Sequence, residues 1–238
     1  MIPFLRPSDP FPPVSKALRS PNGLLCAGAD LSPGRIIDAY SRGIFPWFSE
    51  GDPILWWSPH PRMVLFPGEL KVSRSLRKAV ARGPFETRYD TAFARVMAEC
   101  AAPREGQGGT WIVPEMVRAY TRLHELGFAH SVESWKDGEL AGGLYGLLLD
   151  RVFFGESMFS RETDASKVAL VKLVGRVTSL GVRVIDCQQA TRHLASLGAR
   201  EIPRRDFARL LAESIQYPPT GCRWPATEDA WPSSTTSP

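Results

Sequence analysis

R-V-F-F-G-E-S-M-F-S-R (151–161) and V-R-V-I-D-C-Q (182–188) stand on either side of a helical run, and this stretch decides the fold. Both segments are apolar and typical of buried strands. Between them, residues 165–180 carry apolar side chains at helical spacing, and Gly181 ends the helix. A connection of this length makes the two strands parallel and the crossover right-handed. The sequence therefore predicts a strand–helix–strand unit.

Polar side chains end both predicted strands. They are Glu156, Ser157 and Ser160, which follow Gly155 on the first strand, and Asp186 and Gln188 on the second. Because parallel strands end at the same edge of a sheet, the two groups are expected to lie together. Open α/β sheets bind their ligands at this edge.

The rest of the chain predicts an α+β protein. Helices are expected at 33–42, 73–82, 90–100, 114–126 and near 204–214, with a short one after Gln188. From Pro114 the predicted order is helix, three antiparallel strands, helix, parallel strand, helix, with a hairpin turn at Asp137-Gly138. We expect a small N-terminal α/β domain (1–62), a larger domain with a mixed sheet (63–216) and a disordered tail (217–238).

The composition is that of a globular protein. The 238 residues carry a net charge of +4, which permits an acidic or nucleic-acid partner without requiring one. The four cysteines are scattered and are expected to be free thiols in a reducing cytoplasm. The four histidines lack ligand spacing, so no metal site is expected. No signal peptide or membrane span is expected either.

One predicted helix is basic. Arg74, Arg77 and Lys78 share a face of the helix that begins after Ser73. A solvated surface is the ordinary explanation for such a face, and a nucleic-acid contact is the alternative. The glycine-rich run G-Q-G-G-T-W (106–111) is not a phosphate-binding loop, because no G-K-[ST] follows it.

Long strings of residues resemble the leucyl/phenylalanyl-tRNA–protein transferase family, from about Pro21 to Phe207. They include P-N-G-L-L (21–25), D-L-S-P (30–33), P-I-L-W-W-S-P (53–59), R-S-L-R-K (74–78), L-H-E-L-G (123–127), G-G-L-Y-G (142–146), F-F-G-E-S-M-F-S-R (153–161), I-D-C-Q (185–188) and S-L-G-A-R-E-I-P-R (196–204). The resemblance implies that the second domain has a GNAT-type N-acyltransferase fold, in agreement with the predicted order of elements.

The resemblance also implies a reaction. Such an enzyme transfers leucine or phenylalanine, and less well methionine, from charged tRNA to proteins that begin with arginine or lysine. The products are degraded by the N-end rule pathway. The partners are leucyl-, phenylalanyl- or methionyl-tRNA and the acceptor protein; no cofactor is expected, and the family suggests a cytoplasmic monomer.

The expected chemistry is aminolysis of an ester. A protein α-amine has a pKa of about 7.7 to 8, so about a tenth is deprotonated at neutral pH. A positioned acceptor could add about 10²- to 10⁴-fold. Asp186 is the candidate acceptor, and Gln188 is expected to hold the amine or the carbonyl oxygen. Glu156 could pair with the acceptor's basic residue or with the donor's α-ammonium; a structural ion pair with Arg161 is the alternative.

The donor side chain needs an apolar pocket. Its candidates are Leu144, Phe153, Met158, Leu170 and Ile185, with Gly155 and Ser160 nearby, although core packing alone could explain several of them. Leu144, Leu173 and Val177 stand where relatives can carry larger side chains, so the size of the pocket is expected to differ. Trp47 and Trp111 are the candidates for stacking on the terminal adenosine. Arg74, Arg77 and Lys78 are expected to bind the acceptor stem through its phosphates.

Three other classes of protein are alternatives to this prediction. A coenzyme A-dependent acetyltransferase would need a glycine-rich turn before the crossover helix, where this chain has S-R-E-T-D-A-S-K (160–167). A tRNA- or peptide-binding module would share the basic helix and the tryptophans but would leave Glu156, Asp186 and Gln188 without a role. A serine hydrolase is disfavoured, because Ser157 lacks the G-x-S-x-G context.

Overall fold

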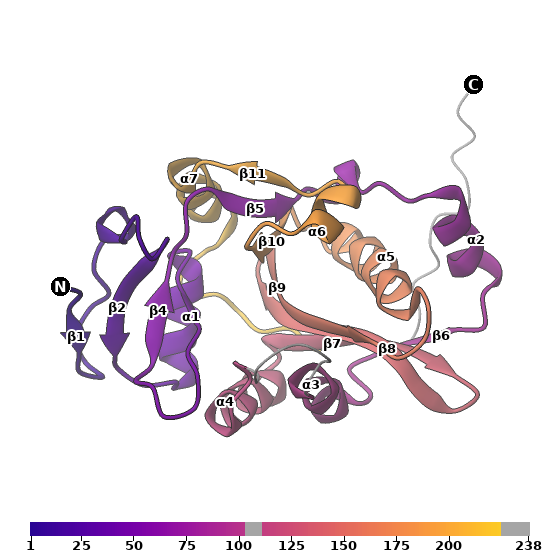
Figure 1. Ribbon diagram of the computed structural model, residues 1–238, viewed down its shortest axis with the longest axis horizontal. Coiled ribbons are helices and arrows are strands. Elements are labelled where there is room, and N and C mark those ends of the chain that lie inside the picture. Colours follow the sequence, from indigo (N-terminus) through magenta and orange to yellow (C-terminus); the bar gives the residue numbers. More distant parts are fainter. Residues whose placement is uncertain (103–110, 225–238) are drawn as a thin grey trace.

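The computed structural model describes residues 1–102 and 111–224, which form two β-sheets (Figure 1). The first sheet has the strand order β1-β2-β4-β3. Its strands are β1 (Phe4–Leu5), β2 (Leu24–Gly28), β3 (Phe45–Pro46) and β4 (Leu55–Trp57), accompanied by the short 3-10 helix η1 (Val14–Lys16) and helix α1 (Pro33–Ser41). Helix α1 begins at Pro33 as predicted, with proline in its first turn.

The second sheet is larger and mixed, with the order β11-β5-β10-β9-β8-β7-β6. Its strands are β5 (Arg62–Leu65), β6 (Glu86–Tyr89), β7 (Ala129–Lys136), β8 (Glu139–Leu149), β9 (Val152–Ser160), β10 (Val184–Gln188) and β11 (Arg200–Ile202). Its helices are η2 (Pro67–Glu69), α2 (Arg74–Arg82), α3 (Phe93–Ala101), α4 (Pro114–Glu125), α5 (Ala165–Ser179), α6 (Arg192–Ser196) and α7 (Arg204–Ser214). The chain passes from the first sheet at Trp57 to the second at Arg62; the domain limits stay a prediction.

The predicted strand–helix–strand unit and the three antiparallel strands before it are confirmed. Strands β7, β8 and β9 are antiparallel neighbours, and β10 pairs in parallel with β9 after the crossover helix α5. The turn at Asp137-Gly138 joins β7 to β8, and both of its residues have positive φ angles, as a tight hairpin requires. Alternation of side chains across these strands therefore places one set against α5 and the other against α3 and α4 (Figure 1).

Several elements differ from the predictions. The strands β6 and β11 are too short to be recognised from their periodicity, and both lie at edges of the sheet. Asp90 does not cap a helix: its φ is 57°, it pairs with His130, and α3 begins after Ala92. The tail from residue 217 onward was expected to be disordered; in its described part, residues 217–224, Trp224 is only 7% exposed. Residues 225–238, and the glycine-rich run up to residue 110, lie outside the described residues.

The hydrophobic core lies on both faces of the large sheet. One cluster includes Tyr145 and Phe154 with residues of α1, α3 and α4. The other includes Leu144 and Phe153 with residues of α5. Strands β9 and β10 separate after a short paired stretch, because their pairing joins residues 152–154 to residues 184–186 while β9 continues to Ser160. The two clusters adjoin the sheet at this point.

Candidate active site

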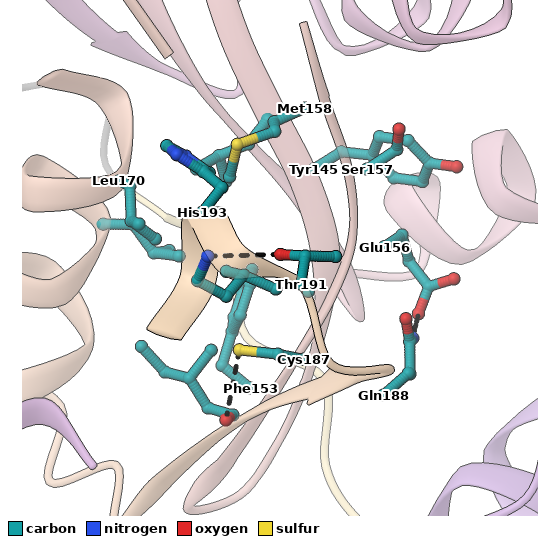
Figure 2. A pocket seen from close by; sticks show the side chains of 15 residues that line it. Tyr145, Phe153, Glu156, Ser157, Met158, Leu170, Cys187, Gln188, Thr191 and His193 are labelled. Carbon is teal, nitrogen blue, oxygen red and sulfur yellow. Dashed lines mark hydrogen bonds between the residues drawn. The ribbon is translucent and has the colours of Figure 1, made fainter. Parts of the chain in front are cut away.

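A pocket of about 350 Å³ opens beside β9, where it separates from β10. Six predicted substrate-binding residues line it, namely Leu144, Phe153, Gly155, Met158, Leu170 and Ile185. Glu156 and Gln188 line it too, so the structure brings these eight predicted residues together. Figure 2 shows Phe153, Leu170 and Met158 around the apolar part, with Glu156 and Gln188 side by side at another part of the wall.

Other lining residues were not predicted from sequence. They are Tyr145, Ser157, Leu173, Cys187, Thr191, His193 and Leu194. Leu173 was noted as a position where larger side chains occur, and its place in the wall agrees with an effect on pocket size. Val177, noted for the same reason, lies on α5, is fully buried in the core and is not part of the wall. Burial, and to a smaller extent the charge of the nearby Asp186, raises the pKa of the Cys187 thiol to about 12, so this thiol is uncharged at neutral pH.

Glu156 is held by three hydrogen-bond donors. Tyr40 and Gln188 donate to Oε1 at 2.8 Å and 2.9 Å, and Tyr120 donates to Oε2 at 3.2 Å. The two tyrosine hydroxyls are 2.5 Å apart. Desolvation raises the pKa of Glu156 to about 7; the Tyr40 hydrogen bond opposes this increase and the Asp186 charge adds to it. Glu156 can therefore exist as acid or carboxylate near neutral pH, and a cation bound beside it would favour the carboxylate.

Arg161, the example of a basic partner in the structural alternative, does not pair with Glu156. Arg161 pairs with Glu99 through two hydrogen bonds, at 2.9 Å and 2.5 Å. The partners of Glu156 are instead the hydroxyls of α1 and α4, which sequence reasoning missed. Tyr40 and Tyr120 are both fully buried, and a buried tyrosine hydroxyl usually has a hydrogen-bond partner. That requirement was the available signal, since both tyrosines lie on the apolar faces of predicted helices.

Asp186 is not exposed to the pocket. It is fully buried and accepts two hydrogen bonds from Arg62, at 2.8 Å from Nε and 2.6 Å from Nη2. Arg62 also donates to the carbonyl oxygen of Gly43 at 3.2 Å, and its guanidinium lies over the rings of Phe45 and Phe207. Both carboxylate oxygens of Asp186 therefore accept a hydrogen bond from Arg62. Arg62 was not predicted as the partner of Asp186, although an arginine at the start of an apolar strand was a signal.

Asp186 also shapes the turn that carries Gln188. Its Oδ1 accepts a hydrogen bond from the backbone N–H of Gln188 at 2.9 Å. Gln188 has a φ of 57°, and the pairing of β10 with β5 shifts register between these two residues. A glutamine in the left-handed region is uncommon, so this local hydrogen bond compensates a strained backbone. The turn directs the Gln188 amide to Glu156.

The remaining predicted residues lie outside this pocket. Ser160 donates to the carbonyl oxygen of Glu162 at 2.8 Å. Trp47 is 39% exposed and packs edge-to-face against Trp57, with ring centroids 5.4 Å apart, while Trp111 is half-buried against the core. The structure does not bring these three together with Glu156. The basic residues Arg74, Arg77 and Lys78 are exposed on α2 and surround a shallow surface hollow, separate from the pocket.

Comparison with known proteins identifies the family. The model of the leucyl/phenylalanyl-tRNA protein transferase family matches residues 64–212, and the model of its N-terminal domain matches residues 29–60. The chain belongs to this transferase family. Proteins named leucyl/phenylalanyl-tRNA–protein transferase from Nitrosospira multiformis and Chromobacterium violaceum are 61% and 62% identical to it over 224 residues. These alignments cover 94% of this chain and 97% and 96% of the relatives.

Solved structures give a weaker likeness. A GCN5-related N-acetyltransferase from Kribbella flavida aligns with a TM-score of 0.40 at 13% identity, covering 71% of this chain and 60% of that one. The C-terminal domain of a putative lysylphosphatidylglycerol synthetase from Agrobacterium fabrum gives 0.41 at 13% identity, covering 76% and 69%. No functional conclusion follows from scores of this size.

The family assignment gives the Tyr40–Glu156 contact a further meaning. Tyr40 lies in the part that matches the transferase family's N-terminal domain, and Glu156 lies in the part that matches its main domain. The carboxylate of the site therefore depends on both parts of the family's chain.

Among the described residues no helix is long and apolar enough to cross a bilayer.

Proposed function

We propose that this protein transfers leucine or phenylalanine, and less well methionine, from charged tRNA to the N-terminal α-amine of proteins that begin with arginine or lysine. The products would enter N-end rule degradation in the cytoplasm. The observation that carries the proposal is the apolar pocket with Glu156 and Gln188 in its wall. Its aliphatic and aromatic lining fits an unbranched or γ-branched apolar side chain, and the polar end fits the reacting groups of an amino acid.

The donor amino acid is oriented by two parts of the pocket. Its side chain occupies the region lined by Phe153, Met158 and Leu170. Its α-ammonium lies against Glu156, the carboxylate in the pocket wall, whose hydrogen-bond partners among the described residues are Tyr40, Tyr120 and Gln188 and include no basic side chain. Binding of a cation would hold Glu156 ionised and thereby offset the desolvation that raises its pKa.

The reaction then requires orientation more than a strong base. The acceptor's neutral α-amine attacks the ester carbonyl, the C–N bond forms, and the bond to the ribose 3′-oxygen breaks. The amine loses a proton and the leaving oxygen gains one, so deacylated tRNA is released. Gln188 is placed to contact the amine or the carbonyl oxygen, and alignment of reacting groups can itself contribute several kcal/mol.

Asp186 acts on this step indirectly in our proposal. Its two oxygens are engaged by Arg62, and it fixes the backbone of Gln188. It is therefore a positioning residue rather than a group that contacts the amine. Removing it would disturb Gln188 and leave the Arg62 guanidinium buried without its counter-ion.

Contacts with the tRNA complete the proposal. The exposed cations Arg74, Arg77 and Lys78 would bind phosphates of the acceptor stem, which adds affinity without reading sequence. Trp47, partly exposed on the smaller sheet, remains a proposed stacking surface for the terminal adenosine, together with Trp111.

The test is transfer of radiolabelled leucine or phenylalanine from charged tRNA to two acceptors that differ in their first residue. We expect label on the protein that begins with arginine and not on a matched protein that begins with glycine, without ATP. Binding of tRNA with no transfer would support a binding module instead. Equal labelling of both acceptors would support the transferase activity but contradict the proposed selection of acceptors that begin with a basic residue.

A further inference from the structure

The last described residue, Trp224, lies in the core beside the pocket. Its side chain is 7% exposed, within the cluster that contains Leu144, Phe153 and the apolar face of α5. It follows α7 by ten positions and lies beyond residue 212, where the match to the main family model ends. A large buried indole at this position either only stabilises the core or also determines the shape of the neighbouring pocket.

The tail reaches this place through a defined backbone path. The N–H of Cys222 donates to the carbonyl oxygen of Gly127 at 2.9 Å, and Arg223 donates to the carbonyl oxygen of Glu125 at 3.3 Å. Gly127 has a φ of 79°, and a Cβ there would lie 3.1 Å from the Cys222 carbonyl oxygen. The end of α4 therefore holds the tail just before Trp224.

The indole belongs to a fixed stack of side chains. His130 Nδ1 is 2.8 Å from Asp90 Oδ2, which sets the orientation of the imidazole. The His130 ring stacks on Trp224 with centroids 4.2 Å apart and an angle of 7°. Tyr89 packs edge-to-face against the indole, with centroids 6.1 Å apart. These contacts leave Trp224 little freedom to move.

Phe153 transmits this arrangement to the pocket. The centroids of the Phe153 and Trp224 rings are 6.1 Å apart, and the angle between the ring planes is 29°. On the strand side the Phe153 ring lies so close to Gly146 that a Cβ there would be 2.6 Å from it. The Phe153 ring, which forms part of the pocket wall, is thus held between the Gly146 backbone and the indole.

We infer that Trp224 determines the depth of the donor side-chain pocket by holding Phe153 in place, and so sets the preference between leucine and phenylalanine. This inference rests on the proposed transferase function. Trp224 is a positioning residue, because it acts through Phe153. A smaller residue at this position would let the Phe153 ring move back, and the deeper pocket would favour the larger donor side chain over the smaller one.

The test compares kcat/KM for phenylalanyl-tRNA and leucyl-tRNA in the full-length protein with Trp224→Leu and Trp224→Phe. We expect the phenylalanine-to-leucine ratio to rise about fivefold or more in Trp224→Leu, which lies within the discrimination of apolar pockets. Trp224→Phe keeps a ring and should raise the ratio about twofold. The KM for the acceptor protein should stay unchanged in both variants.

The control is Trp135→Leu, which removes an equally buried tryptophan from the core on the opposite face of the sheet. It should lower stability without changing the donor ratio. An unchanged ratio in a folded Trp224→Leu would overturn the inference; if that variant does not fold, an unchanged ratio in Trp224→Phe does so. Absence of transfer by the unaltered protein would instead remove the proposed function itself.

Discussion

Replacing Glu156 by glutamine should change how the stability of the free protein depends on pH. The folded-state pKa of this carboxyl is about 7, above its ordinary 4.5, chiefly because of desolvation. An increase of this size corresponds to roughly 3 kcal/mol, at about 1.4 kcal/mol for each pH unit. Since Glu156 as a residue is half-buried rather than fully buried, screening reduces the expected effect to about 2 kcal/mol.

The sign follows from the order of the two pKa values. Near pH 4.5 and below, the carboxyl is protonated in the folded protein, so its burial costs little. Between pH 4.5 and 7 the folded protein retains a proton that the unfolded chain has lost, so stability falls as the pH rises. Above pH 7 the folded protein carries the full cost of a buried carboxylate. Glutamine carries no charge at any of these pH values.

The assay is urea unfolding of the wild type and Glu156→Gln at pH 5, 6, 7 and 8. The unfolding free energy of the variant, relative to the wild type, should increase by about 2 kcal/mol from pH 5 to pH 8. Glu139→Gln is the matched control, because Glu139 pairs with Arg95 at the surface and its side chain is 77% exposed. Its difference should stay within about 0.5 kcal/mol. If the difference in unfolding free energy between Glu156→Gln and the wild type changed by less than about 0.5 kcal/mol from pH 5 to pH 8, the reasoning would be refuted.

Three further results are expected from the same site and its surroundings. Asp186→Ala should lower the unfolding free energy by about 3–5 kcal/mol in urea titrations, because Arg62 remains buried without its partner; a loss below about 1 kcal/mol would contradict the pairing. Leu173→Phe should narrow the pocket and lower the phenylalanine-to-leucine ratio of kcat/KM by about tenfold or more, whereas an unchanged ratio would place Leu173 outside the donor site. Alanine at the three predicted tRNA-binding positions of α2 should flatten the dependence of tRNA affinity on salt by about two to three in the log–log slope, and an unaltered slope would mean that this face is merely solvated.

Local patterns in the sequence were enough to predict the centre of the fold. Apolar periods of two and of 3.6 residues predicted β9, α5 and β10, and the length of the connection made the strands parallel. The same reasoning placed the side chains of β9 and α5 in one pocket, because they face each other across a single crossover. These relations depend on residues near in sequence, so they could be predicted without coordinates.

Contacts between distant parts of the chain could not be predicted in this way. Asp186 and Arg62 are separated by 124 positions, and Glu156 and Tyr40 by 116. Nothing in a local period specifies such partners, although the cost of burying an unpaired charge says that one must exist. The burial of Trp224 was not predicted for a related reason: a proline-rich tail favours disorder, and both the buried indole and the backbone anchor at Gly127 depend on residues distant in sequence.

The separation of β9 from β10 explains why one pocket can combine apolar and ionisable walls. Beyond the paired residues 152–154 and 184–186, the two faces of the sheet are no longer divided by backbone hydrogen bonds between these strands. Phe153 belongs to the core on the α5 face, whereas the hydroxyls that hold Glu156 come from α1 and α4 on the other face. A donor amino acid placed in the gap can therefore bury its side chain on one face and present its charged and reacting groups to the other. A closed sheet would keep these two environments apart.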